Sequence, residues 1–220
     1  GIGVSGILFA LVNGIVLQPL PYPEPEQLVR IFDLNRQSGI ARTGATSGNV
    51  AEWRQRTSAF EGIAGYYSMG RTASLADAAE AVITAQVSED FFDVMRVSPI
   101  LGRTFTSEET QRAEFNNAAA PIGADPVVIL SHGFWRRRLG ADPNAIGQTL
   151  MLERRPFKVV GVMPPGFTVP ERGVELWIPW HISTESPRDQ HYLGALARLK
   201  AAAGPDAAAK LERAPTLIAV

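Results

Sequence analysis

The chain has 220 residues, and 45% of them are hydrophobic, which is enough for one large core or two small ones. Its 21 lysines and arginines nearly balance 22 aspartates and glutamates, so it lacks the broad positive field that sequence-independent nucleic-acid binding requires. Because it has no cysteine, the sequence excludes disulfides, thiol nucleophiles and thiolate metal sites.

The first segment, residues 1–17, is uncharged and rich in aliphatic side chains. As a helix it would be about 26 Å long, slightly shorter than the roughly 30 Å hydrocarbon core of a bilayer. We therefore expect the C-terminal part of a transmembrane helix over residues 1–18, with further residues upstream. Two alternatives fit the segment less well. A signal peptide would need a basic start and a small-residue cleavage site, which the segment does not show. A helix in a soluble core would be weakened in water by the glycines.

The same segment contains G-x-G-x-x-G at Gly1, Gly3 and Gly6, a pattern typical of dinucleotide-binding folds. That motif places an acidic residue after a second strand, about 20 residues further on. Here Glu24 stands at that distance, but it lies among four prolines. We therefore predict no cofactor.

Residues 18–26 contain these four prolines, which cannot continue a helix, so we expect an extended exit from the membrane. Residues 27–33 then alternate in the manner of a strand. Asn49 and Glu52 have the spacing of a capping box, which predicts the start of a helix. The apolar stripe of that helix comprises Val50, Trp53, Thr57, Phe60 and Ala64.

Two strands, at residues 66–72 and 80–87, are predicted to be joined by a turn near residues 76–79. Residues 88–90 would then begin a short helix. Its apolar residues are Phe91, Phe92 and Met95. The succession of strand, helix and strand predicts a βαβ-type layer.

The polar stretch at residues 107–125 predicts a mobile surface loop. Residues 127–130 follow as a strand of the buried type. Ser131 is then placed to cap a helix that ends at Gly140.

The remaining elements are mostly strands. Residues 148–153 and 157–162 predict a hairpin, and residues 174–180 predict another strand. We expect the last strand at residues 191–200 and a truncated helix from about residue 205.

Seven sequence blocks follow one another along nearly the whole chain: LQPLPYPEPEQLV (17–29), WRQRTSAF (53–60), VSEDFF (87–92), LGRTF (101–105), ILSHGFW (129–135), GQTL (147–150) and VVGVMPPGF (159–167). Taken in this order, they resemble the MacB-like periplasmic core domain of FtsX-like ABC-transporter permeases. The exit Leu-Pro-Tyr-Pro is similar to that of the duplicated acidobacterial type.

This resemblance implies an α+β fold, with an N-terminal transmembrane helix followed by a two-lobed extracytoplasmic domain. A mixed α/β lobe is inserted into a βαβ-type lobe. The implied boundaries are 1–18 for the helix and 19–220 for the domain. Within the domain, the first βαβ-type part is 27–100, the inserted lobe 101–188 and the start of the second part 189–220.

The resemblance also implies a permease subunit in the bacterial cytoplasmic membrane, with the residues after about 18 on the periplasmic or extracellular side. Such a subunit transmits ATPase-driven conformational change for export or envelope processes. Its partners would be a separate ABC ATPase, a second permease half or a second copy, and membrane lipid around residues 1–18, with a periplasmic adaptor left open. The chain has no Walker A pattern, so ATP hydrolysis would belong elsewhere.

A membrane-anchored binding or chaperone-like module without a transport role is the alternative. No catalytic, cofactor or metal site is predicted in either case. The three histidines, His132, His181 and His191, do not form a short metal-ligand spacing. Ser131 and His132 match only half of a nucleophile elbow, and capping explains Ser131. We therefore expect that the chain is not an enzyme.

Several charged and aromatic groups have structural interpretations. The pairs Glu89/Asp90 and Glu108/Glu109 suit the starts of helices, where the helix dipole favours acids. The basic run 136–138 suits a solvated helix face. For Trp177 and Trp180, a partner groove and a packed strand remain open alternatives.

Overall fold

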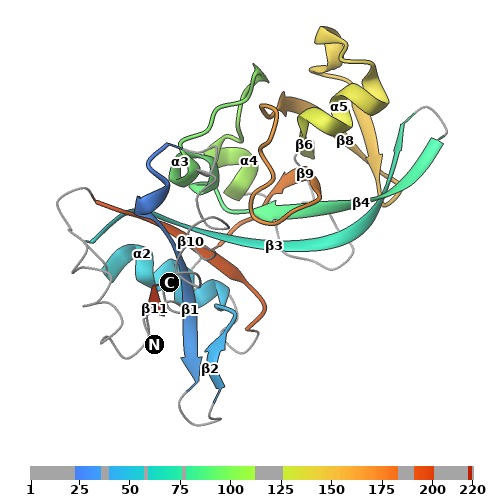
Figure 1. Cartoon of the computed structure of the whole chain (residues 1–220). Helices are drawn as coiled ribbons and strands as arrows, with labels where there is room; N and C mark the ends of the chain where they lie inside the picture. Colours follow the sequence, from blue (N-terminus) through green and yellow to red (C-terminus); the bar gives the residue numbers. More distant parts are fainter. Residues whose placement is uncertain are drawn as a thin grey trace, which may run out of the picture.

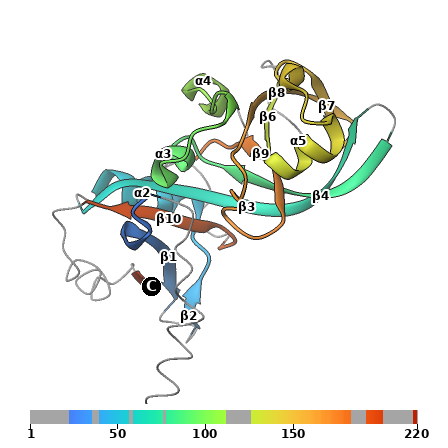
Figure 2. The ribbon, with the colours of Figure 1, turned by 45° about the horizontal axis from the view of Figure 1, so that its top comes forward.

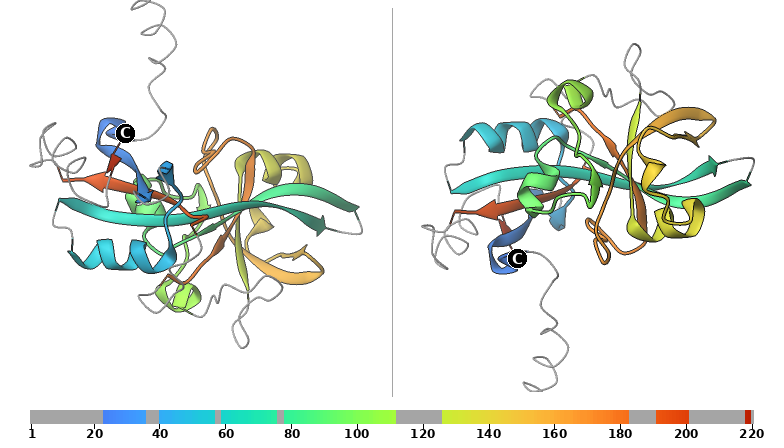
Figure 3. Two further views of the ribbon diagram at one scale, coloured as in Figure 1. Left: turned by 90° about the horizontal axis from the view of Figure 1, so that it is seen from below. Right: turned by 90° about the horizontal axis from the view of Figure 1, so that it is seen from above.

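Two long antiparallel strands, β3 (Phe60–Leu75) and β4 (Ala78–Val87), run through the whole fold (Figure 1). The computed structural model describes residues 23–35, 40–56, 59–75, 78–111, 126–182, 191–200 and 218–219. Figure 3 shows α2 (Ser47–Arg56) and α5 (His132–Leu139) at opposite ends of this strand pair. The long pair therefore connects two differently built parts of the molecule.

The strands form one mixed sheet in the order β11-β1-β10-β3-β4-β9-β6-β8-β5, with β2 beside β1 and β7 bridging β3 and β8. Their bounds are β1 (Leu28–Asn35), β2 (Ile40–Thr43), β5 (Leu101–Gly102), β6 (Val127–Leu130), β7 (Thr149–Leu152), β8 (Arg155–Val162), β9 (Val174–Pro179), β10 (Gly194–Leu199) and β11 (Ile218–Ala219).

At one end, β10 lies between β1 and β3 and is antiparallel to both, so β1 and β3 are parallel to each other. The helix α2 connects β1 and β3 through β2, which makes a split βαβ unit. The expected strand-helix-strand succession is therefore present. The late strand β10 occupies its centre, which the local sequence pattern did not indicate.

At the other end, β7 pairs with both β3 and β8 and closes the sheet on itself. The closed path β3-β4-β9-β6-β8-β7 is called the ring below (Figure 2). The predicted hairpin forms β7 and β8, and Glu153 and Arg154 turn the chain between them with positive φ angles of 48° and 64°. Each strand of the ring therefore pairs with another ring strand on both of its sides.

Buried side chains in the described residues form three clusters, which we name by their position. The α2 core packs Val50 and Trp53 of the helix against Ile63 of β3. The α3 core lies on the opposite face, because Ala64 follows Ile63 and successive strand residues point to opposite sides. The third cluster, the ring core, surrounds Phe134 of α5.

Two predictions about helices are wrong in detail. The helix α2 begins at Ser47 because Thr46, rather than Asn49, accepts the capping bond: Thr46 Oγ1 is 3.1 Å from the Asn49 backbone nitrogen. The helical stripe also ends early, since Phe60 and Ala64 lie in β3 and pair with β10. Pairing with a distant strand overrides their helical spacing.

The predicted loop at 107–125 is also partly wrong, because α4 (Ser107–Gln111) forms at its start. Residues 112–125 lie outside the described residues, as do the predicted transmembrane segment 1–18 and the helix from about 205. Among the segments that the structure describes, no helix is both long and apolar enough to cross a bilayer. The expected internal boundaries of the domain stay predictions.

The capping role of Ser131 is confirmed, because its Oγ accepts a hydrogen bond of 3.0 Å from the Phe134 nitrogen, and Gly140 ends α5 at φ 58°. Replacing Ser131 with alanine should lower the free energy of unfolding by about 1 kcal/mol, because the helix loses a capped amide. Urea denaturation measures this, with the exposed Ser107→Ala as control and an expected change below about 0.5 kcal/mol. Equal effects of the two substitutions would contradict the capping role.

Candidate functional site at the chain junction

The two ends of the described chain meet on one strand. After η1 (Pro25–Gln27), β1 pairs on one side with β10 and on the other with β11. Ile31 pairs with a residue of each neighbouring strand, Ala195 of β10 and Ala219 of β11. The segment before β1, residues 23–27, is called the approach segment below. The approach segment and the last described strand are therefore anchored at the same place.

A buried arginine joins the approach segment to the rest of the molecule. Arg198 of β10 is only 1% exposed, and its Nε donates to the Val94 carbonyl at 2.7 Å. Its Nη1 donates to the carbonyls of Pro23 and Glu24, each at 3.2 Å. One guanidinium thus links β10, α3 (Phe91–Met95) and the approach segment.

A second arginine makes a parallel link at the surface. Arg96 ends α3 with a left-handed conformation at φ 52°. Its guanidinium forms ion pairs with Glu24 and, at 2.7 Å, with Glu61 of β3. Since Arg96 is 36% exposed, these pairs stabilise less than buried ones would, but they fix the direction in which the approach segment leaves.

The helix α3 connects this junction to the ring. Its residues Phe91, Phe92, Val94 and Met95 are buried in the α3 core. The Phe92 ring lies 6.1 Å from that of Phe167, which follows β8, and the Phe167 ring lies 5.2 Å from that of Trp177 in β9. These ring contacts pack α3 directly against residues that follow β8 and lie in β9.

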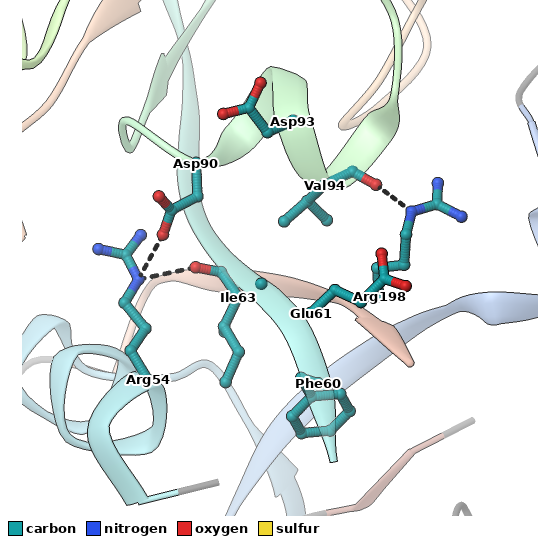
Figure 4. A pocket seen from close by; sticks show the side chains of 9 residues that line it. Arg54, Phe60, Glu61, Ile63, Asp90, Asp93, Val94 and Arg198 are labelled. Atoms are coloured by element: carbon teal, nitrogen blue, oxygen red, sulfur yellow. Dashed lines mark hydrogen bonds and ion pairs between the residues drawn. The ribbon is translucent and has the colours of Figure 1, made fainter. Parts of the chain in front are cut away.

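A polar pocket of about 470 Å³ lies beside Arg198, between α2, α3, β3 and β10. Figure 4 shows Arg54 and Arg198 on opposite sides of it, with α3 along its edge. Arg54 Nε donates to the Ile63 carbonyl at 2.7 Å and pairs with Asp90 at 3.1 Å, and its Nη2 donates to Ser88 Oγ at 2.8 Å. Burial lowers the pKa of Arg54, while Asp90 and Glu89 act in the opposite direction.

These pairings suit a structural joint better than acid-base chemistry. Ser88 Oγ also accepts from the Gly65 nitrogen at 3.0 Å, so Arg54 and Ser88 tie α2, β3 and the start of α3 together. The described part of the chain contains no group of three metal-ligating side chains. The contacts of this site hold α2, β3 and the segment before α3 in fixed relation.

The MacB-like periplasmic core domain family matches residues 1–214. The chain belongs to this family. The resemblance seen in the sequence blocks is thereby confirmed, and the chain contains the periplasmic domain of a MacB-like ABC-type permease. No curated protein sequence matches the chain.

Solved structures share this MacB-like fold. The periplasmic region of MacB from Actinobacillus actinomycetemcomitans has a TM-score of 0.60 at 17% identity, covering 84% of this chain and 79% of that one. A permease-protein domain from Porphyromonas gingivalis has a TM-score of 0.60 at 15% identity, covering 87% and 85%. The extracellular domain of the ABC-type transporter YknZ from Gram-positive bacteria has a TM-score of 0.55 at 12% identity, covering 88% and 99%.

In this MacB-like domain the residues weighed as catalytic have structural partners. Ser131 caps α5, and the His132 ring contacts the Trp135 ring at 5.6 Å between centroids. His191 Nδ1 lies 3.2 Å from the Gly44 carbonyl oxygen. These contacts give Ser131 a capping role and give His132 and His191 neighbours of their own. The absence of enzymatic activity stays a prediction.

The acidic pairs lie at helix starts, as predicted. Asp90 precedes α3, and Glu109 completes a capping box with Thr106, whose nitrogen is 2.8 Å from the Glu109 carboxylate. Arg103 binds the same carboxylate through two nitrogens at 2.9 and 2.7 Å. Burial raises the pKa of Glu109, but the bonds from Arg103 and Thr106 outweigh it and leave the pKa below its usual value.

The basic run makes more ion pairs, and the tryptophans are more deeply buried, than the sequence indicated. Arg137 pairs with Glu175 at 2.8 Å and with Glu80 at 3.3 Å, and Arg138 pairs with Glu80 at 3.1 Å. The solvated face is therefore a set of ion pairs between α5 and the ring. Trp177 and Trp180 are 0% and 1% exposed, which supports the packed-strand alternative over the partner groove.

Sequence reasoning missed Arg198, Arg96 and Arg54. A signal existed for Arg198, because it lies between Ala197 and Leu199 in a strand predicted to be packed, where an arginine needs a buried partner. Its partners are backbone carbonyls 104 to 175 residues away, and no side-chain pattern marks those.

Proposed function

We propose that this domain transmits ATPase-driven conformational change from the membrane part of a permease to the extracytoplasmic side, in export or an envelope process. The observation that carries the proposal is the junction: the approach segment and β11 both attach to β1, and Arg198 ties that place to α3. A shift of either chain end is therefore passed on to a packed core.

Three physical steps make up the transmission. Movement of the approach segment pulls on Arg198, which donates to the Val94 carbonyl of α3, and on Arg96, which is the C-cap of α3. The α3 helix cannot yield locally, because four of its residues are buried. The displacement therefore reaches the ring through Phe92, Phe167 and Trp177. The sequence favours a membrane helix at residues 1–18 as the source of the movement.

The partners proposed with this function are a separate ABC ATPase, a second permease half or a second copy of the subunit, and membrane lipid around residues 1–18. A periplasmic adaptor is a further candidate. Nucleic acid is not among the partners, since the chain carries a formal net charge of -1. We also propose that the domain has no enzymatic activity of its own.

Single engineered cysteines test this function well, because these 220 residues contain no cysteine, and any cysteine elsewhere in the permease or its ATPase is first replaced with serine. In the full-length permease with its ATPase, Asn144→Cys beside α5 should react with a membrane-impermeant maleimide from the extracytoplasmic side of intact cells. Reaction only after lysis would contradict the location. A spin label at the same cysteine should change its mobility when ATP is added.

The matched variants separate transmission from simple exposure. Arg96→Gln removes the ion pairs to Glu24 and Glu61 and should reduce the ATP-dependent change while leaving the labelling yield unchanged. Arg136→Gln, an exposed arginine of α5, should leave both unchanged. A label at Asn144→Cys that is insensitive to ATP in the permease with no other substitution would favour the membrane-anchored binding module instead.

A further inference from the structure

A second pocket, of about 350 Å³, opens on the α3 face of the sheet next to the approach segment. We call it the seam groove, because the approach segment, β1, α3 and β10 form one side and the loop at residues 168–172 forms the other. Its volume is within the range of pockets that bind small molecules. Its lining comprises Pro25, Leu28, Val29, Arg30, Met95, Thr168, Val169, Pro170, Glu171, Arg172 and Leu196.

The floor of the seam groove is apolar. Leu28, Val169 and Leu196 are only partly buried and pack against the α3 core from outside. Met95 beneath them is 2% exposed. These three partly exposed side chains come from β1, from the loop after β8 and from β10, so an apolar chain lying over them would touch both sides of the groove. Covering such a surface is favourable in proportion to the area removed from water.

The rim of the seam groove is charged and partly preorganised. Arg30 donates to Tyr66 Oη at 2.6 Å, and its guanidinium carbon lies 6.0 Å from the centre of the Tyr66 ring. Arg172 is exposed at the opposite rim, next to the exposed Glu171. Burial raises the pKa of Tyr66, with Arg30 opposing and Glu171 adding to the rise. The lining thus contains two guanidiniums and one carboxylate, and this excess of positive charge favours an anion.

We propose that the seam groove binds a single-chain anionic amphiphile, with its apolar chain over Leu28, Val169 and Leu196 and its anionic group between Arg30 and Arg172. Arg30 is held in place by Tyr66, so little side-chain entropy is lost when it binds the anion. The ligand would bridge β1 and β10 to the loop at residues 168–172, next to the approach segment, and so stiffen a seam beside the path along which the proposed function sends its movement. The binding itself depends on the groove and not on transport.

Calorimetric titration of the purified full chain with three surfactants of equal chain length tests this proposal, at concentrations below micelle formation. Dodecanoate should bind saturably and at least about tenfold more tightly than dodecyltrimethylammonium, with dodecyl maltoside in between. Arg172→Glu should weaken the binding of dodecanoate by about tenfold or more and reduce the preference for dodecanoate over dodecyltrimethylammonium. Thr168→Trp, at an exposed rim position, should weaken all three surfactants by filling the groove.

Arg136→Glu carries the same charge change on α5, away from the groove, and should leave dodecanoate binding within about twofold. Equal binding of the three surfactants, or an equal loss in Arg172→Glu and Arg136→Glu, would overturn the proposal and indicate adsorption to apolar surface elsewhere. Because residues 1–18 are expected to enter bilayers by themselves, vesicle binding is compared between variants: if Arg172→Glu weakens binding to anionic vesicles but not to dodecanoate monomers, the proposal is overturned in favour of a bilayer surface. None of these results depends on ATP-driven movement, so a failure here is distinct from a failure of the proposed function.

Discussion

Replacing Arg198 with methionine should lower the free energy of unfolding by about 3 kcal/mol, because the substitution removes the guanidinium bonds to the Val94, Pro23 and Glu24 carbonyls. The Glu24 carbonyl keeps its second bond, from the Gln27 nitrogen. Methionine fills a similar volume, so the loss reports hydrogen bonds more than a cavity. The carbonyls of Pro23 and Glu24 lie near the surface, where water recovers part of the loss. Urea denaturation of the full chain measures the change.

Amide hydrogen exchange adds a local readout to the same experiment. In Arg198→Met, the amides of residue 24 and of residues 26–28 should exchange faster than in the unmodified chain, while amides of β6 and β8 should keep their protection relative to global unfolding. Arg136→Met, at an exposed position of α5, serves as control and should change stability by less than about 0.5 kcal/mol. If Arg198→Met were as mild as this control, the approach segment would not be anchored by Arg198.

Replacing Gly194 with alanine should cost about 2 to 3 kcal/mol, because overpacking a filled core forces side chains out of their rotamers. Gly194 is the cross-strand partner of Tyr66, and a Cβ added there would lie 2.0 Å from Tyr66 Cζ. The ring of Tyr66 therefore covers the glycine, and it would have to leave its place in the α3 core. Movement of Tyr66 would also break its hydrogen bond from Arg30.

A double-mutant cycle identifies the cause of that loss. In a Tyr66→Ala background the clash is gone, so Gly194→Ala should cost less than about 1 kcal/mol. Thermal or urea unfolding of the four proteins supplies the coupling energy. An equal cost in both backgrounds would show that the backbone of β10, rather than the tyrosine ring, rejects the side chain.

Local patterns predicted the elements that depend on neighbours in sequence. Ser131 and Gly140 bound α5 because caps act within one turn, and the residues around Arg154 form a hairpin because its strands adjoin along the chain. Phe60 and Ala64 were misassigned because their spacing also fits a helix, and only pairing with Leu199 and Leu196 of β10 decides for a strand.

The candidate site was less predictable than the fold. Its central contacts join residues far apart in sequence, and most of them involve backbone carbonyls, which every residue type carries alike. Family resemblance supplied the general function, but no motif marked Arg198 or Arg96. A packed strand that contains a single arginine, as in Ala197-Arg198-Leu199, is the pattern that would have pointed to the junction.

The late arrival of β10 has a consequence for biogenesis. Arg198 and the carbonyl of Glu24 are 174 residues apart, so β1 has β2 beside it early but lacks β10 until residues 194–199 have been synthesised. Pairings of such high sequence separation form slowly, since a long loop has to close before any contact rewards it. The ring, whose strands span residues 60–179, has all its partners earlier and is expected to be the first part to acquire stable structure.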